Sequence, residues 1–119
     1  FQKMEPKPQI TIEDFAKLDL RAATVLAAEV HPNADRLLKL QVDLGFEQRQ
    51  ICAGVRQFVN PETLVGRQIV VVANLKERAI RGELSAGMLL AVSVMGDDQL
   101  LEVVLLHPDK PVPNGSVVG

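Results

Sequence analysis

The sequence has few aromatic residues, a single cysteine and no long apolar run. Four Phe, with no Trp or Tyr, make up its 3% of aromatic residues, so a surface for stacking single-stranded bases is poorly supplied. One cysteine, Cys52, excludes an intramolecular disulfide framework and favours a reducing compartment. No wholly apolar run is longer than that of residues 69–73, which is far shorter than the roughly 20 residues that span a membrane as a helix.

Motifs for catalysis and metal binding are missing as well. His31 and His107 are far apart and form no metal-ligand spacing with Cys52. No paired carboxylates, nucleophilic triad or phosphate-binding loop are evident, so we expect neither enzyme activity nor a cofactor. The chain begins with Phe1 and carries no signal-peptide pattern, so we expect a cytoplasmic protein of which this sequence is a fragment.

The composition is that of one globular domain. Of the 119 residues, 47% are hydrophobic and 24% are charged, which is enough apolar material for a packed core. The net charge of −2, taken as an average, argues against a protein that binds nucleic acid or a membrane surface, because such proteins usually carry a positive surface. Residues 1–10 are polar with two prolines and indicate a linker, which leaves residues 11–119 as the domain.

Local patterns predict short helices and several strands. Thr11 and Asp14 form a capping box for a first helix, and Asn60 and Pro61 begin a second one that Gly66 ends. Residues 38–44 alternate apolar and polar side chains, as in a strand with one buried face. The expected helices are 12–18 and 61–65; the expected strands are 20–30, 38–44, 47–53, 67–73, 86–94 and 99–106, with a polar loop over 74–84 and an extended tail over 107–119.

This order of elements predicts an all-β, five-stranded OB-fold barrel. Three strands, a short helix and two further strands is the arrangement of that fold, here with a helix before the first strand and a C-terminal extension. The fold binds oligonucleotides on its second and third strands and through flanking loops. Loops 31–35 and 74–84 are then expected beside the binding face, with Lys39, Gln41 and Arg49 on its floor.

Charge is distributed unevenly along the chain. Residues 36–81 carry eight basic and four acidic side chains, whereas residues 82–119 carry one basic side chain and five acidic ones. The positive segment covers the expected binding strands and is densest at residues 76–81. Lys and Arg in such a loop suit contact with phosphates. A solvated surface loop explains the same charges.

Four stretches resemble the C-terminal tRNA-binding domain of bacterial methionyl-tRNA synthetases and related free-standing tRNA-binding proteins. They are Ile-Glu-Asp-Phe-Ala-Lys-Leu-Asp-Leu-Arg (12–21), His-Pro-Asn-Ala-Asp-Arg-Leu (31–37), Val-Val-Ala-Asn-Leu-Lys-Glu-Arg-Ala-Ile-Arg-Gly (71–82) and Ser-Ala-Gly-Met (85–88). The resemblance extends over residues 12–117, and residues 7–15 are similar to the junction with a synthetase body.

The resemblance implies a homodimer that recognises the folded shape of tRNA without catalysis, with the segments outside the barrel at the dimer interface. The tRNA-binding residues that it implies are Asn74, Lys76, Arg78, Arg81, Ser85 and Met88, with Arg36 and Lys39 as helpers. Glu77 and Ala79 depart from the more basic family pattern, which is expected to weaken binding. From the residues alone, Asn74 also fits a turn, Met88 a core position and Ser85 a strand edge.

Two alternatives stay open. A secretion-related, protein-binding chaperone family is similar in fold and dimer, and an exposed apolar groove on the dimer would favour it. The tRNA-binding domain of another synthetase, such as the β-chain of the phenylalanine enzyme, carries a similar His-Pro-Asn-Ala-Asp stretch. The start Ile-Glu-Asp-Phe (12–15) argues against the second alternative.

Overall fold

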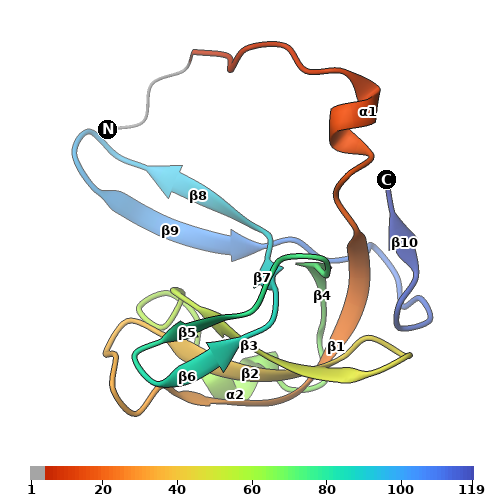
Figure 1. Cartoon of the computed structure of the whole chain (residues 1–119). Coiled ribbons are helices and arrows are strands. Elements are labelled where there is room, and N and C mark those ends of the chain that lie inside the picture. Colours follow the sequence, from red (N-terminus) through yellow and green to blue (C-terminus); the bar gives the residue numbers. More distant parts are fainter. Residues whose placement is uncertain (1–4) are drawn as a thin grey trace.

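Three consecutive antiparallel strands form the first wall of the molecule. The computed structural model describes residues 5–119, and its strands β1 (Leu20–Val30), β2 (Leu38–Asp43) and β3 (Gln48–Ala53) pair in chain order (Figure 1). The alternating pattern of β2 is confirmed, because Leu38, Leu40, Val42 and the following Leu44 are fully buried.

Helix α2 (Pro61–Leu64) then leads to β4 (Gln68–Val72), which pairs with the other side of β1. The order continues to β7 (Met88–Leu89), so the sheet runs β3-β2-β1-β4-β7. The sheet curls back on itself, since the Ala86 amide just before β7 donates to the Gln50 carbonyl of β3 at 2.9 Å. The expectation of a five-stranded, OB-like barrel is therefore confirmed.

Aliphatic side chains from every barrel strand meet in one core. The largest fully buried members are leucine, isoleucine and valine residues: Leu38, Leu40, Leu44, Ile51, Leu64, Ile69, Val25, Val42 and Val71. Leu105, from outside the barrel sheet, packs into the same core. Burial of this apolar surface is the main favourable contribution to folding.

The expected strand 86–94 is wrong in one respect, because it is two strands. Leu90 interrupts it: its amide donates to the Val70 carbonyl, and its carbonyl accepts from Leu106, at 3.0 and 3.1 Å. β7 stays in the barrel, whereas β8 (Ala91–Met95) leaves it and pairs with β9 (Leu100–Leu105). In Figure 1 this β8–β9 hairpin extends above the barrel toward the left, whereas α1 and β10 lie at the right.

The expected helix 12–18 is shorter than its apolar pattern indicates. α1 (Ile12–Phe15) has the predicted capping box between Thr11 and Asp14, but it buries no residue. The chain is redirected directly after it, because the Asn74 side chain binds the Lys17 carbonyl and the Asp19 amide. A helix with no packed face gains little from a further turn.

The loop predicted over 74–84 contains a hairpin. β5 (Arg78–Ile80) and β6 (Glu83–Ser85) form a separate two-stranded sheet, joined by Arg81 and Gly82. Both turn residues have positive φ, 49° and 90°. Such two-residue turns fit the twist of antiparallel strands, and Arg in place of the usual Asn or Asp hides the signal from the sequence. The tail, expected to be extended or looped, ends in a short strand, β10 (Val117–Val118), on β1.

Candidate nucleic-acid interface

The predicted binding residues line two separate hollows beside the β5–β6 hairpin. The first, which we name the hairpin hollow, has a volume of about 480 Å³ and is lined by Cys52, Leu75, Lys76, Arg78, Ser85, Gly87 and Met88. The second, the loop hollow, has a volume of about 370 Å³ and is lined by Asn33, Ala34, Asp35, Arg36, Leu37 and Arg81. The structure thus groups four predicted residues in one hollow and two in the other, while Asn74 and Lys39 line neither hollow.

The hairpin hollow combines positive charge with apolar surface. Lys76 and Arg78 are exposed, and neither forms a salt bridge within residues 5–119. Leu75 and Met88 beside them are 44% and 48% exposed. The alternative from the sequence, a core position for Met88, is therefore wrong. Cations that have no internal partner are free to meet phosphates, and apolar side chains beside them can contact a sugar or base.

Ser85 and Gly87 shape this hollow from below. Ser85 is 3% exposed; its hydroxyl accepts from the Cys52 amide at 2.9 Å and donates to the Gly87 carbonyl at 3.1 Å. Gly87 has φ of 139°, and a Cβ there would lie 3.0 Å from the Val72 carbonyl oxygen. The Ser-Ala-Gly-Met stretch therefore joins β6 to β3 through Ser85 and lets the chain before β7 approach β4 at Gly87, and it leaves Met88 at the surface.

Asn74 fastens the segment before β1 to the end of β4. Its Oδ1 accepts from the Asp19 amide at 2.9 Å, and its Nδ2 donates to the Lys17 carbonyl at 2.6 Å. These contacts occupy the amide group on both sides, as the turn interpretation expects. Its position next to Leu75 and Lys76 makes it a residue that places the loop.

Lys39 lies between two carboxylates on the outer surface of β2. Its Nζ is 3.1 Å from an oxygen of Glu29 and 3.1 Å from an oxygen of Glu83. Hydrogen bonds to Glu29 and Glu83 raise the pKa of Lys39 above its usual 10.5, and the bond from Lys39 lowers the pKa of Glu83 below 4.5. The charge of Lys39 is therefore internally balanced.

The other two residues expected on the floor are also engaged. Gln41 Nε2 donates to Oε1 of Gln50 at 2.8 Å. Arg49 binds the Ala73 carbonyl and pairs with Glu47 at 2.6 Å. The floor of the face is thus a fixed polar network, and the accessible cations lie at its edges.

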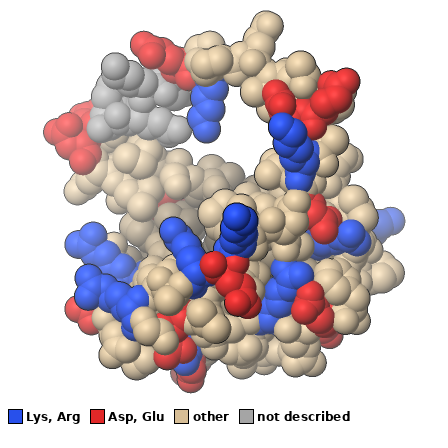
Figure 2. Space-filling view, viewed as in Figure 1, with Lys and Arg blue, Asp and Glu red and all other residues tan. Residues whose placement is uncertain are grey.

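Figure 2 shows the charged side chains on one face of the molecule. Most of its Lys and Arg side chains lie over the barrel half, and acidic side chains lie among them. Arg36, Lys76, Arg78 and Arg81 are all exposed and belong to the two hollows. The positive segment recognised in the sequence therefore borders the hollows, although two acids outside that segment, Asp35 and Glu83, reduce the positive charge of this surface.

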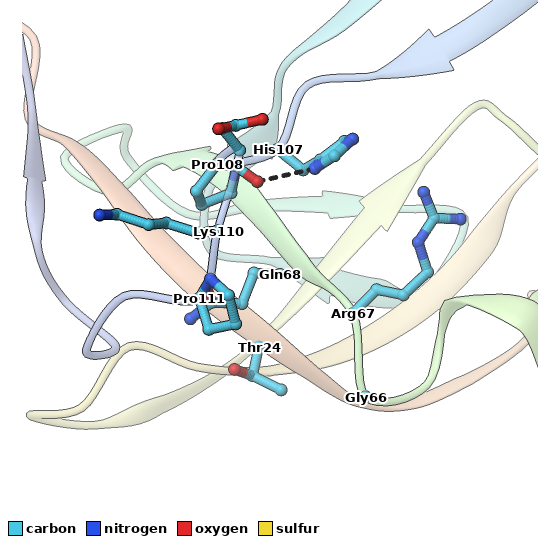
Figure 3. Close-up of a pocket in the computed structure, with 9 residues that line it drawn as sticks. Thr24, Gly66, Arg67, Gln68, His107, Pro108, Lys110 and Pro111 are labelled. Atoms are coloured by element: carbon cyan, nitrogen blue, oxygen red, sulfur yellow. Dashed lines mark hydrogen bonds between the residues drawn. The ribbon is translucent and has the colours of Figure 1, made fainter.

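A third hollow, of about 370 Å³, lies away from the predicted residues, between the tail and the β1–β4 pair (Figure 3). Thr24 and Gln68 at its base bind Asn114 of the tail, at 2.7 and 3.1 Å. Arg67 and Lys110 lie at opposite ends of it, so their charges do not converge. We assign no ligand to this hollow.

Several residues that organise the face were missed from the sequence. Glu29, Gln50 and Glu83 complete the polar network, and Asn33 contacts the β5–β6 turn. Glu83 and Lys39 are 44 positions apart, so no local pattern reveals their contact. The structure places no membrane-spanning helix and no cluster of three or more metal-ligating side chains within residues 5–119.

Comparison with known proteins identifies relatives of this chain. Residues 20–117 match the tRNA_bind family model, whose description is "Putative tRNA binding domain". A methionine–tRNA ligase of Chlorobium limicola is 56% identical over 103 residues, which are 87% of this chain and 14% of that protein. One of Clostridium acetobutylicum is 46% identical over 118 residues, 98% of this chain and 18% of that protein. The chain thus spans less than a fifth of the length of either ligase.

Solved structures agree with the fold. A MetRS-related protein from Pyrococcus horikoshii has a TM-score of 0.86 and 31% identity, covering 95% of this chain and all of that one. The chaperone CsaA of Bacillus anthracis has a TM-score of 0.80 and 34% identity, covering 94% of this chain and all of that one. On the family match and these relatives, the chain belongs to the tRNA_bind family.

Proposed function

We propose that this domain binds tRNA by its folded shape, with little preference for base sequence, as the C-terminal module of a methionyl-tRNA synthetase. The observation that carries the proposal is the hairpin hollow, where Lys76 and Arg78 are exposed and form no ion pair with any residue of the described range 5–119. The assigned contacts are Lys76, Arg78 and Met88 there and Arg36 and Arg81 at the loop hollow. Asn74, Ser85 and Lys39 support the site from within.

The side chains available favour contact with the RNA backbone over base readout. Cations at the rim of a face position phosphates and carry little sequence information. Phe46 is 59% exposed, but Arg21 and Arg49 lie over its ring, at 5.7 and 5.9 Å from the centroid. An aromatic ring that already stacks on two guanidiniums is a poor platform for a base. Folded RNA presents its phosphates and 2′-hydroxyls to such a surface.

Within a synthetase, the module raises the effective concentration of tRNA near a separate active site. It contributes binding and no catalytic step of its own. Residues 11–119 form this unit and residues 1–10 link it to the rest of the protein; residues 1–4 lie outside the described part. The working form is a cytoplasmic homodimer, with the β8–β9 hairpin and tail at the interface. The single buried thiol, Cys52, fits a reducing compartment.

Replacement of Arg78 by alanine tests the proposal. We expect the variant to bind bulk tRNA about fivefold more weakly, since a hydrogen bond to a charged group contributes roughly 1 kcal/mol or more. Wild-type affinity should fall steeply between low and high salt, as phosphate contacts require. Gel-shift titrations of several purified tRNAs across a salt series measure both effects.

The control is Arg67→Ala, which removes the same charge from an exposed residue outside both hollows. It should bind tRNA nearly as wild type. Absence of wild-type binding at low salt contradicts the proposal, and loss confined to one tRNA species contradicts recognition by shape.

A protein-binding chaperone is the second candidate function. It is favoured by the likeness to the chaperone CsaA and by exposed apolar side chains on the β8–β9 hairpin, such as Val92 and Leu101. The same experiment separates the two, because binding of unfolded protein through apolar surface does not weaken as salt rises. Suppression of aggregation by the protein, unchanged in Arg78→Ala and without tRNA binding, would favour the chaperone.

A further inference from the structure

The tip of the β5–β6 hairpin has a backbone conformation that needs support from outside. Arg81 has φ of 49° and is the only non-glycine residue with positive φ within residues 5–119. This conformation is unfavourable for side chains with a Cβ, and it persists where neighbouring groups hold it. The hairpin forms its own small sheet, and side-chain bonds from Lys39 and Gln50 hold its β6 strand, so the Arg81 turn itself depends on other contacts.

Two residues of loop 31–37 hold this tip. The His31 ring binds the Ile80 carbonyl through Nε2 at 2.8 Å, and Asn33 Nδ2 donates to the Arg81 carbonyl at 3.1 Å. The Asn33 amide donates to His31 Nδ1 at 2.9 Å, so Nδ1 carries no proton and Nε2–H is the donor to Ile80. His31 is 2% exposed, and both its ring nitrogens are used within the fold.

The loop that carries these residues is itself well fixed. The His31 amide donates to the Leu37 carbonyl at 3.0 Å, which closes the loop at its base. Arg56 binds it from the side, since its guanidinium donates to the Asp35 carbonyl at 2.9 Å. A closed and braced loop can hold the hairpin tip at a constant position.

The consequence is that two guanidiniums from distant parts of the chain share one hollow. Arg36 enters the loop hollow from loop 31–37, and Arg81 enters it from the hairpin tip. Both side chains are exposed, and neither forms a salt bridge within residues 5–119. Asp35 is the one acidic residue that lines this hollow, so it keeps a net positive charge. Two forked donors around one cavity suit a phosphate group.

We infer that His31 and Asn33 are positioning residues that clasp the hairpin tip to loop 31–37, so that Arg36 and Arg81 bind one phosphodiester of the RNA backbone from two sides. This inference rests on the proposed tRNA binding and identifies the chemical group recognised at the loop hollow. Glycine is favoured at the backbone conformation of Arg81, but only a side chain can bind the phosphate. The clasp stabilises the arginine in this conformation.

A double-mutant cycle with Asn33→Ala tests the clasp. Asn33 is exposed, so its truncation leaves the core intact, which a thermal melt checks. We expect Asn33→Ala to weaken tRNA binding about fivefold and to reduce the slope of log K against log salt by about one phosphate contact. In an Arg81→Ala background the same change should have almost no further effect, because the contact that it positions is already gone.

The matched control is the cycle of Asn33→Ala with Arg78→Ala, an arginine on the same hairpin that lines the other hollow. These two effects should multiply. His31→Ala, compared at a temperature where it remains folded, should repeat the pattern of Asn33→Ala. The inference is overturned if Asn33→Ala binds as wild type, or if its effect multiplies with that of Arg81→Ala. Failure of the wild type to bind tRNA overturns the proposed function instead.

Discussion

At the scale of single residues, the surroundings of a cation decide what it can bind. Lys39 and Lys76 are both lysines of the positive segment, yet Lys39 is surrounded by Glu29 and Glu83 and Lys76 lines an open hollow. A phosphate that approaches Lys39 must displace a carboxylate or share the cation with it. Residue type and sequence position therefore identify the candidates, and ion pairing selects among them.

Glu83→Gln should strengthen tRNA binding, by a factor of about two to five, because it removes one negative charge from the face and releases Lys39 from one partner. The variant keeps an oxygen that can accept from Gln50. Gel-shift titration at low salt measures the change. Glu62→Gln, which removes an exposed acid from α2, should leave affinity nearly unchanged. Weaker binding by Glu83→Gln would show that the ion pair orders the face.

The same variant has a defined pH dependence of stability. The pKa of Glu83 is lowered in the folded state by the hydrogen bond from Lys39, so its contribution is present above the unfolded value of 4.5 and is lost as pH falls through the folded value. The raised pKa of Lys39 keeps that partner charged up to pH 10.5. The difference in Tm between wild type and Glu83→Gln should stay constant at neutral pH and shrink below about pH 4.5.

At the scale of elements, the sequence predicts correctly those features that depend on neighbouring residues alone. Caps at Thr11 and Asn60 and the alternation in β2 are short-range features, and the structure contains each of them. The β5–β6 hairpin was missed because its turn uses Arg81, whose positive φ is held by Asn33 from a distant loop. The break at Leu90 has a similar cause. β7 ends where Leu90 bonds to Val70 and Leu106, and no turn residue in the local sequence marks this point.

The tail is held to the barrel by a side chain of β4. Gln68 donates to the Val112 carbonyl at 2.7 Å and accepts from the Val112 amide at 3.0 Å. Further along the tail, the Gly115 amide donates to the Ala22 carbonyl at 2.7 Å. Several bonds therefore hold the tail to the barrel, and Gln68 fixes its position at Val112.

Gln68→Ala should therefore destabilise the fold by about 1–3 kcal/mol, because it leaves half-buried backbone groups of Val112 without partners. Urea unfolding measures the loss, and faster amide hydrogen exchange at Val112 and Gly115 locates it in the tail. Gln48→Ala, an exposed glutamine of β3, should change stability by less than about 0.5 kcal/mol. Unchanged exchange at Val112 in Gln68→Ala would show that the tail is held by other contacts.

At the scale of the whole molecule, apolar and basic surfaces lie on different parts. The β8–β9 hairpin is rooted in the core by Leu105 and then extends beyond the barrel. Its exposed apolar side chains are Val92, Val94, Leu100, Leu101 and Val104. The average charge of −2 conceals the basic hollows, just as the average hydropathy conceals this hairpin. A domain of this size rarely exposes so many apolar side chains on one element without a partner for them.

The double variant Val92→Asp/Val94→Lys tests the proposed homodimer through this hairpin. The two exposed side chains lie on one face of β8, and Val94 is opposite Glu102 on β9, so a lysine there gains a cross-strand partner. The opposite charges leave the net charge unchanged, and a change in tRNA affinity then reports the loss of a second attachment point. Sedimentation should show a dimer for wild type and a monomer for the variant, whose affinity for tRNA falls at least tenfold.

Val65→Asp, which places a charge on an exposed valine after α2, should remain a dimer. A wild type that sediments as a monomer would contradict the dimer. A dimeric double variant would place the interface elsewhere, and α1 and the tail would then be the next surfaces to change.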